Sequence, residues 1–345
     1  MRILHLIFSM QVGGTESMLV DIANCQSVNE KVDIIIVNDE IHEPLLTKLD
    51  KAINVIKLKR KPGSKSIFPI LQLQTIILKN RYNIIHCHNH NMAGMLLPVF
   101  KKRSILTVHT TGVKSVFFSK YKNIYAISQA VANDLKQRAD VSSIVVNNGI
   151  DFSQIETKKL QCRTERHENF HIVQVSRLNT NNKGQHVLIE AARILKERGV
   201  DNIEIDFIGE GKSLDKLQDL VNDYQLDKNI RFLGLRDRSY IYSHLKNYDL
   251  LVQPSFYEGF GLTVVEGMAA KIPVLVSNIE GPMEVIEFGK YGDFFEVGNV
   301  NCLADKIQEI IQRSENQKAV EMAYEYALKN YSVQSTAKRY LEEVK

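Results

Sequence analysis

The feature that most constrains the fold is an alternation of short apolar strands with helical patterns. In the first half of the chain, runs rich in Val, Ile and Leu are separated by segments such as 15–26 and 68–80, whose apolar residues have helical spacing. Strands that are apolar along their whole length are typical of a parallel sheet covered by helices on both faces. The strands predicted here are 2–8, 32–37, 53–58, 83–88, 104–109, 123–128 and 143–148.

The alternation begins again near Phe170, after a polar stretch at 158–170 that lacks periodicity and reads as a linker. The predicted strands are 171–176, 203–209, 230–234, 249–254 and 273–277, with helices at 184–199, 213–226, 239–248 and 262–270, and two or three more in 301–345. We therefore predict an α/β chain of two doubly wound, Rossmann-like domains. Ligands of such sheets bind at the carboxyl ends of the strands, which we expect to face a cleft between the domains.

The composition is that of an ordinary globular protein of 345 residues, with 44% hydrophobic and 24% charged residues. No apolar run approaches the roughly 18 residues of a membrane-spanning helix. The opening MRILHLIFSM lacks the small-residue cleavage site of a signal peptide, so it reads as a buried strand. The cysteines are Cys25, Cys87, Cys162 and Cys302. Because none of them forms a CxxC pair, we expect free thiols and a cytoplasmic location.

Positive charge is concentrated in the first half of the chain. Between Lys51 and Asn133 there are 14 Lys and Arg residues and no Asp or Glu. An acid-free basic stretch of this length indicates an anionic partner: a phosphate-bearing acceptor, a membrane surface or a nucleic acid. The alternative is a surface whose charge only keeps the protein in solution.

Two cations lie on the loop that follows the first strand of the second half. Arg177 comes directly after this strand, and Lys183 lies at the start of the next helix. An Arg fork and a Lys point charge, six residues apart beside a helix N-terminus, suit a diphosphate. Solvated loop cations are the alternative. The nearby GEG at 209–211 lacks the full glycine-rich phosphate spacing and predicts only a tight turn.

Two carboxylates flank the start of a later helix, in EGFGLTVVE at 258–266. Gly261 lets the backbone approach a ligand closely, and the helix begins near Leu262 with free N–H groups. Glu258 can reach a polyhydroxylated group, and Glu266, one turn into the helix and on a face predicted to be buried, can accept hydrogen bonds from a ribose diol. The acids of a hydrolase usually lie on different elements, so this pattern favours binding of a nucleotide sugar.

These motifs resemble the retaining glycosyltransferases of family 4, which have the GT-B fold and a Glu-x7-Glu signature. The resemblance covers the whole chain and follows the family's order. It rests on GGTE at 13–16, TVHTTG at 107–112, AISQAVANDL at 126–135, VVNNGID at 145–151, VSRLNTNNKG at 175–184 and FYEGFGLTVVEGMAAKIPVLVS at 256–277. It implies an acceptor-binding domain at 1–165, a nucleotide-sugar-binding domain at 166–325 and a helix at 326–345 that crosses back onto the first domain.

The resemblance also implies roles for individual residues. The donor diphosphate is expected to be held by Arg177, Lys183, Gly14, Gly261 and the backbone of Leu262 and Thr263. Glu266 is expected to bind the ribose and Glu258 the transferred sugar, while His109 matches the histidine that hydrogen-bonds the sugar at the reaction centre. Family members need no metal ion or cofactor, because bound cations stabilise the leaving diphosphate.

A histidine-rich segment, HCHNHN, ends the strand at 83–88. His86, His88 and His90 have a spacing that can bind a metal ion, but no carboxylate or second cluster is near in the sequence. We favour an alternative in which His88 faces the acceptor, His86 is packed and His90 begins a helix.

The predicted activity is that of a retaining hexosyltransferase. The resemblance favours a UDP-sugar donor, with GDP-mannose as the main rival, and the loop at 277–286 is expected to contact the sugar. The expected acceptor is a glycan or a polyprenyl-diphosphate-linked sugar of a bacterial surface polysaccharide. The basic segments 57–66 and 101–104, with Ile67 and Phe68 or with 116–118, are expected to contact anionic lipid headgroups at the inner face of the membrane.

Three other functions compete with this one. A sugar-nucleotide epimerase has the same fold but releases no transfer product. A catalytically silent nucleotide-sugar-binding subunit would be expected to lack some of the residues named above. A nucleic-acid-binding protein fits the basic stretch but lacks a recognisable reading module.

Overall fold

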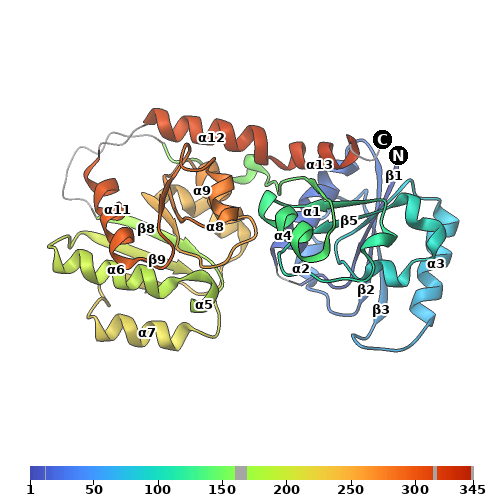
Figure 1. The fold of residues 1–345 in the computed structure, drawn as a ribbon, viewed down its shortest axis with the longest axis horizontal. Helices are drawn as coiled ribbons and strands as arrows, with labels where there is room; N and C mark the ends of the chain where they lie inside the picture. Colours follow the sequence, from blue (N-terminus) through green and yellow to red (C-terminus); the bar gives the residue numbers. More distant parts are fainter. Residues whose placement is uncertain (12, 160–168, 314–316, 343–345) are drawn as a thin grey trace. The chain divides into compact units, whose positions relative to one another are not determined.

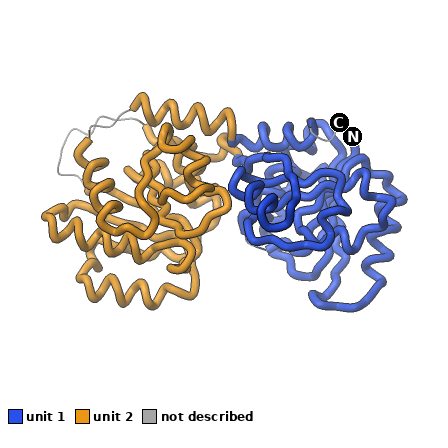
Figure 2. Tube along the Cα trace, viewed as in Figure 1, with its two compact units in different colours: residues 1–150, 331–345 blue, residues 151–330 orange. Residues whose placement is uncertain are grey.

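The computed structural model describes residues 1–11, 13–159, 169–313 and 317–342 (Figure 1). The chain forms two compact units, Met1–Ile150 with Tyr331–Lys345 and Asp151–Asn330 (Figure 2). The division therefore falls at 150/151 and 330/331, whereas the sequence placed it near 165 and 325. Residues just after Ile150 belong to the second unit because they bond to it: the Glu156 N–H donates to the Tyr242 carbonyl. Most of the predicted linker, with Cys162, lies outside the described residues.

Unit 1 contains a parallel sheet of seven strands. They are β1 (Arg2–Ile7), β2 (Lys31–Asn38), β3 (Asn54–Arg60), β4 (Ile84–Cys87), β5 (Ser104–Val108), β6 (Asn123–Ala126) and β7 (Ile144–Val145), in the order β3-β2-β1-β4-β5-β6-β7. The sequence predicts all seven strands, although β7 is shorter than expected. Continuous burial along β1 and β2 confirms that helices cover both faces of the sheet.

The helices of unit 1 include α1 (Gly14–Ser27), α2 (Glu43–Leu46), α3 (Phe68–Asn80), α4 (Gln129–Ala139) and α13 (Val333–Glu342). On one face of the sheet, α1 and α13 close a core that includes Ile3, Ile84 and Tyr340. Helix α13 follows all of unit 2 in the sequence, yet it packs against α1 at the start of the chain.

Unit 2 contains a parallel sheet of six strands in the order β10-β9-β8-β11-β12-β13. The strands are β8 (Phe170–Val175), β9 (Ile203–Ile208), β10 (Ile230–Phe232), β11 (Leu250–Gln253), β12 (Val274–Ser277) and β13 (Asp293–Phe295). The helices are α5 (Thr180–Lys183), α6 (Gln185–Glu197), α7 (Leu214–Asp223), α8 (Arg238–His244), α9 (Leu262–Ala269), α10 (Glu280–Val285), α11 (Val300–Gln312) and α12 (Gln317–Tyr331). Strand β13, with three residues at the edge of the sheet, is not among the strands predicted from the sequence.

The strand order changes direction once in each sheet. This happens between β1 and β4 in unit 1 and between β8 and β11 in unit 2. The loops on the two sides of such a point diverge, which opens a crevice at the carboxyl ends of the strands. The loops after β4 and β5 carry His88 and His109, and those after β8 and β11 carry Arg177 and Glu258. None of the helices in the described part of the chain is long and apolar enough to cross a membrane.

Candidate functional site

The loops after β8 and β11 of unit 2 are held tightly together. Gly184 has a φ of +64°, and a Cβ at this position would overlap the carbonyl oxygen of Pro254. The carbonyl of Asn182 accepts a hydrogen bond of 2.9 Å from the Phe256 N–H. The two loops therefore place Lys183 and Glu258 side by side, although these residues lie 75 positions apart in the sequence.

Lys183 and Glu258 form an ion pair. The side chains are 23% and 22% exposed, so the pair is partly open to solvent rather than part of the core. The Gln253 amide donates to the same carboxylate oxygen over 3.1 Å. The Oε1 atom of Gln253 is buried and has no hydrogen-bond partner among the residues that the structure describes. The carboxylate is thus held by a cation and an amide, and an unused buried acceptor lies beside it.

Arg177 and helix α9 belong to the same unit as this pair. Arg177 is exposed, two residues after the end of β8. Gly261 caps α9 with a φ of +109°, which a residue with a side chain rarely adopts. Leu262 and Thr263 begin the helix, so their N–H groups have no intrahelical acceptor. Glu266 lies one turn further along the helix and is half-buried. Its apolar neighbours predict a fully buried side chain. The difference arises because this turn of the helix is partly open to solvent.

The predicted residues of unit 1 are Gly14, His88 and His109. Gly14 is exposed at the first position of α1, after β1. His109 follows β5 and is half-buried. Burial lowers the pKa of His109 to about 4, so the ring is neutral at physiological pH. Its Nε2 lies 3.4 Å from His88 Nδ1, and its Nδ1 has no hydrogen-bond partner among the described residues.

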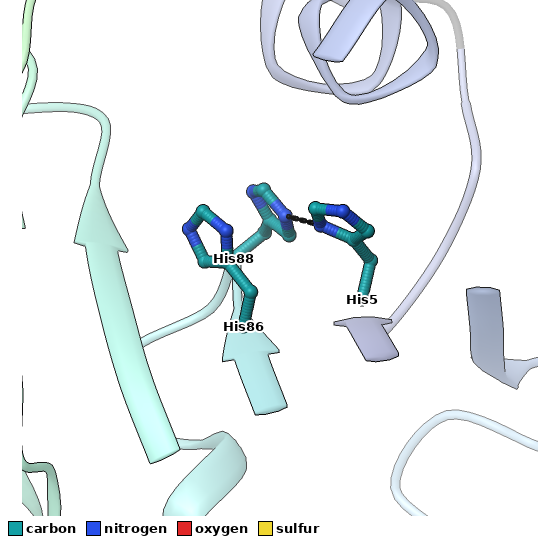
Figure 3. Close-up of side chains that lie close together, drawn as sticks. All are labelled: His5, His86 and His88. Atoms are coloured by element: carbon teal, nitrogen blue, oxygen red, sulfur yellow. Dashed lines mark hydrogen bonds between the residues drawn. The ribbon is translucent and has the colours of Figure 1, made fainter. Parts of the chain in front are cut away.

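The acceptor role predicted for His88 would require its side chain to reach the surface. The structure contradicts this prediction. The side chain is buried, 3% exposed, with rings on several sides. Figure 3 shows it beside His5 and His86, with the bond from its Nε2 to His5 Nδ1 dashed; this bond is 3.0 Å long. Its ring stacks on that of His86, with 4.4 Å between the centroids. The strand register explains why His88 is buried. It pairs His5 on β1 with His86 on β4, and His88 follows directly after β4 beside both rings.

His5, His86 and His88 form the one group in the described residues that could hold a metal ion. One nitrogen of each lies within 4.8 Å of the others. The group differs from the three histidines whose spacing the sequence singled out, since it contains His5 from β1 in place of His90. Both nitrogens of His5 and both of His88 already have polar partners, as does the Nε2 of His86, which lies 2.7 Å from Thr107 Oγ1. Hydrogen bonds thus use most of the lone pairs that a metal would need.

Sequence reasoning missed His5 and Gln26. His5 interrupts an otherwise apolar strand, RILHLI, and a polar side chain at such a position needs a buried partner. The sequence shows this unusual polar residue but does not show its partner, because Gln26 lies 21 residues away on α1.

The surface expected to contact lipid is only partly exposed. Ile67 and Phe68 at the start of α3 are 68% and 71% exposed, and Val116 is 86% exposed. Phe118, in the alternative contact segment 116–118, is buried at 7% exposure because it packs into unit 1.

Two parallel α/β units, with cations and carboxylates on the loops after the strands, define the GT-B class of glycosyltransferase folds. The chain belongs to the glycosyltransferase group 1 family. Residues 155–329 match the family model described as "Glycosyl transferases group 1", and residues 12–154 match "Glycosyltransferase Family 4".

Among curated proteins, an uncharacterized glycosyltransferase of Methanocaldococcus jannaschii is 28% identical over 286 residues, which cover 77% of this chain and 76% of that protein. A poly(ribitol-phosphate) alpha-N-acetylglucosaminyltransferase of Staphylococcus aureus is 27% identical over 76% of this chain, but the match spans only 50% of that protein.

Solved structures show the same fold. A glycosyltransferase of Rickettsia africae matches 99% of this chain and 97% of its own with a TM-score of 0.82 and 22% identity. Anabaena HepE in complex with UDP and glucose matches 99% and 98% with a TM-score of 0.79 and 22% identity.

Proposed function

We propose that this chain is a retaining hexosyltransferase that takes a sugar from a UDP-sugar and delivers it to an acceptor of bacterial surface polysaccharide synthesis. The observation that carries the proposal is the Lys183–Glu258 ion pair beside the N-terminus of α9. A cation and a carboxylate in contact can separate to bind the two sides of one bond: Lys183 takes the diphosphate oxygen, and Glu258 takes hydroxyls of the sugar.

We propose further donor contacts on the loops and helix α9 of unit 2, and one in unit 1. Arg177 is exposed after β8, where it can form a bidentate contact with a phosphate. The N–H groups of Leu262 and Thr263 add the positive end of a helix dipole. Glu266, one turn along the same helix, can accept hydrogen bonds from the ribose. Gly14, exposed at the start of α1, is proposed to approach the diphosphate through its backbone.

The leaving group can be stabilised by these protein charges. Departure of the nucleoside diphosphate places negative charge on the β-phosphate, which Lys183, Arg177 and the α9 N–H groups would offset. We propose that no metal ion is required for this step. His109 is proposed to hydrogen-bond the transferred sugar, and the departing phosphate to help deprotonate the acceptor, so that the sugar is transferred with retention.

The names of the relatives and neighbours support the donor and the pathway. The Anabaena neighbour was solved with UDP and glucose, and a Staphylococcus aureus neighbour, TarM, with UDP. A capsular polysaccharide biosynthesis glycosyltransferase, CapM of Staphylococcus aureus, is 27% identical over 55% of this chain and 52% of its own length. For the acceptor, unit 1 offers an open depression lined by Lys114, Val116 and Arg138, whose cations suit a phosphate-bearing substrate.

The test is a thermal-shift panel of UDP and GDP sugars, followed by a transfer assay with the stabilising donor. We expect a UDP series to stabilise the wild type and Glu266→Ala to lose most of that shift, because the ribose contact is removed. Glu190→Ala, on helix α6 of the same unit, is the matched control and should retain the shift. Stabilisation by GDP sugars alone would mean that the donor base is guanine rather than uracil. If no nucleotide sugar stabilises the protein, the proposal is overturned.

A further inference from the structure

A continuous row of polar contacts runs from helix α1 to His109 in unit 1. Gln26 Oε1 lies 2.9 Å from His5 Nε2, and His5 Nδ1 lies 3.0 Å from His88 Nε2. His88 Nδ1 then lies 3.4 Å from His109 Nε2. The row ends at His109 Nδ1, which is buried without a partner among the described residues.

The protons of this row can be placed one after another. A neutral imidazole has one N–H donor and one acceptor nitrogen. The Gln26 oxygen only accepts, so His5 donates to it from Nε2 and accepts at Nδ1. His88 therefore donates from Nε2 and accepts at Nδ1, and His109 in turn donates from Nε2. Each assignment fixes the next, and the last one leaves His109 Nδ1 with a lone pair and no proton.

The surroundings keep the three rings neutral, as this placement requires. His5 and His88 are buried, 0% and 3% exposed. Burial lowers the pKa of His5 and His109 to about 4, and that of His88 well below its ordinary value.

Packing fixes the ring planes as well as the protons. His86 stacks on His88 at an interplanar angle of 24° and is held by Thr107, whose hydroxyl lies 3.2 Å from the Tyr340 hydroxyl on α13. A side chain that is both stacked and hydrogen-bonded has little freedom to rotate, so His88 presents one atom to His109 in one direction.

We propose that Gln26, His5 and His88 are positioning residues that hold His109 in the Nε2–H tautomer, so that its Nδ1 accepts a hydrogen bond from a hydroxyl of the bound substrate. This inference rests on the proposed function, in which His109 contacts the transferred sugar. It adds the direction of that hydrogen bond: the hydroxyl donates and the protein accepts. A substrate analogue with a methoxy group or fluorine in place of that hydroxyl should then not be accepted, because neither group can donate a hydrogen bond to Nδ1.

The direct test is ¹⁵N NMR of the full chain labelled at histidine, with the His109 signals assigned from His109→Phe. In the wild type we expect a protonated Nε2 and an unprotonated Nδ1 on His109. Gln26→Met removes the acceptor that sets the row, and we expect His109 to become a mixture of the two tautomers. Gln74→Met, the same change at another buried glutamine of unit 1, should leave the tautomer unchanged. A protonated Nδ1 on His109 in the wild type would overturn the proposal.

Kinetics supply a second readout. Gln26→Met should lower kcat by about tenfold, the effect of one misdirected hydrogen bond, with little change in the KM for the donor. UDP binding should be largely retained, since all the proposed nucleotide contacts except the backbone of Gly14 are in unit 2. If UDP binds and transfer occurs but Gln26→Met behaves as the wild type in both readouts, the inference fails while the proposed function stands. If UDP does not bind the wild type, the proposed function itself fails.

The same sample tests the competing use of these rings as a metal site. Addition of Co²⁺ should give no visible absorption that depends on His5. Stoichiometric binding that is lost in His5→Phe would show a metal centre and overturn the hydrogen-bonded row.

Discussion

The buried histidines of unit 1 and the Lys183–Glu258 ion pair of unit 2 differ in charge and in exposure to solvent. The histidines of unit 1 are buried, uncharged and bonded to one another in a row, so their geometry is fixed by tautomers and stacking. Lys183 and Glu258 of unit 2 are charged and about one-fifth exposed, and their attraction is screened by nearby solvent. A buried neutral row is costly to rearrange, whereas a screened ion pair can exchange its partners for a ligand. The first suits the orientation of a substrate, and the second suits the binding of a charged one.

The largest expected effect comes from breaking the charged group. Lys183→Met should lower the transfer rate by about 100- to 1000-fold, because a positive group beside the developing phosphate charge is lost. Steady-state kinetics with the donor identified in the thermal-shift panel measure this. Lys228→Met, a change at an exposed lysine of the same unit, serves as the control and should keep the wild-type rate. A loss of less than fivefold in Lys183→Met would remove this lysine from the reaction centre.

The neutral group should instead appear in the pH dependence of stability. The pKa of His5 is about 4 in the fold against 6.5 for an ordinary histidine, through burial. As the pH falls from about 6.5 to about 4, the unfolded chain therefore binds a proton that the folded chain does not. The free energy of unfolding should decrease by up to about 1.4 kcal/mol per pH unit for each such histidine, and the contribution of His5 should level off below pH 4.

Urea unfolding followed by circular dichroism at several pH values checks this prediction. His5→Phe should flatten the decrease between pH 6.5 and 4, and the exposed His42→Asn should not. An equally steep decrease in His5→Phe would mean that the buried histidines do not control the acid stability of unit 1.

The smallest expected effect concerns the exposed surface of α3. Phe68→Ser should weaken binding to vesicles that contain anionic lipid by several-fold, because an aromatic ring that is 71% exposed no longer enters the interface. Flotation at low and high salt measures it, and Phe288→Ser, at a 72% exposed aromatic in unit 2, is the control. Binding that is absent or insensitive to salt in the wild type would contradict a role for membrane contact.

The sequence predicted the parallel sheets well because a buried parallel strand is apolar along its whole length. It missed β13, whose three residues are too few for a pattern, and it placed the first domain boundary some 15 residues late. Charge and polarity marked residues 158–170 as a linker, but Lys158 is anchored to unit 2 by an ion pair of 2.6 Å with Asp249. A contact between residues 91 positions apart in the sequence cannot be detected from local composition.

The positions of the candidate residues in the fold were predictable where a short motif carries them. Arg177, Lys183, Glu258 and Glu266 lie on the loops and the helix of unit 2 that the motifs indicated. The pairing of Lys183 with Glu258 could not be predicted, since it depends on the close approach of two loops at Gly184. For the same reason the sequence could not show that His88 is buried behind His109: its neighbours, His5 and Gln26, come from other elements.

Helix α13 gives the molecule an unusual order of assembly. It supplies Tyr340 and Val333 to the core of unit 1, but it is made only after every residue of unit 2. Synthesis runs from the N-terminus, and domains usually fold in that order. In this chain the seven-stranded sheet is synthesised before α13, so part of one face stays uncovered until the whole of the second unit has been made. Premature termination before residue 333 would therefore leave the earlier-made unit unfinished and the later-made one whole.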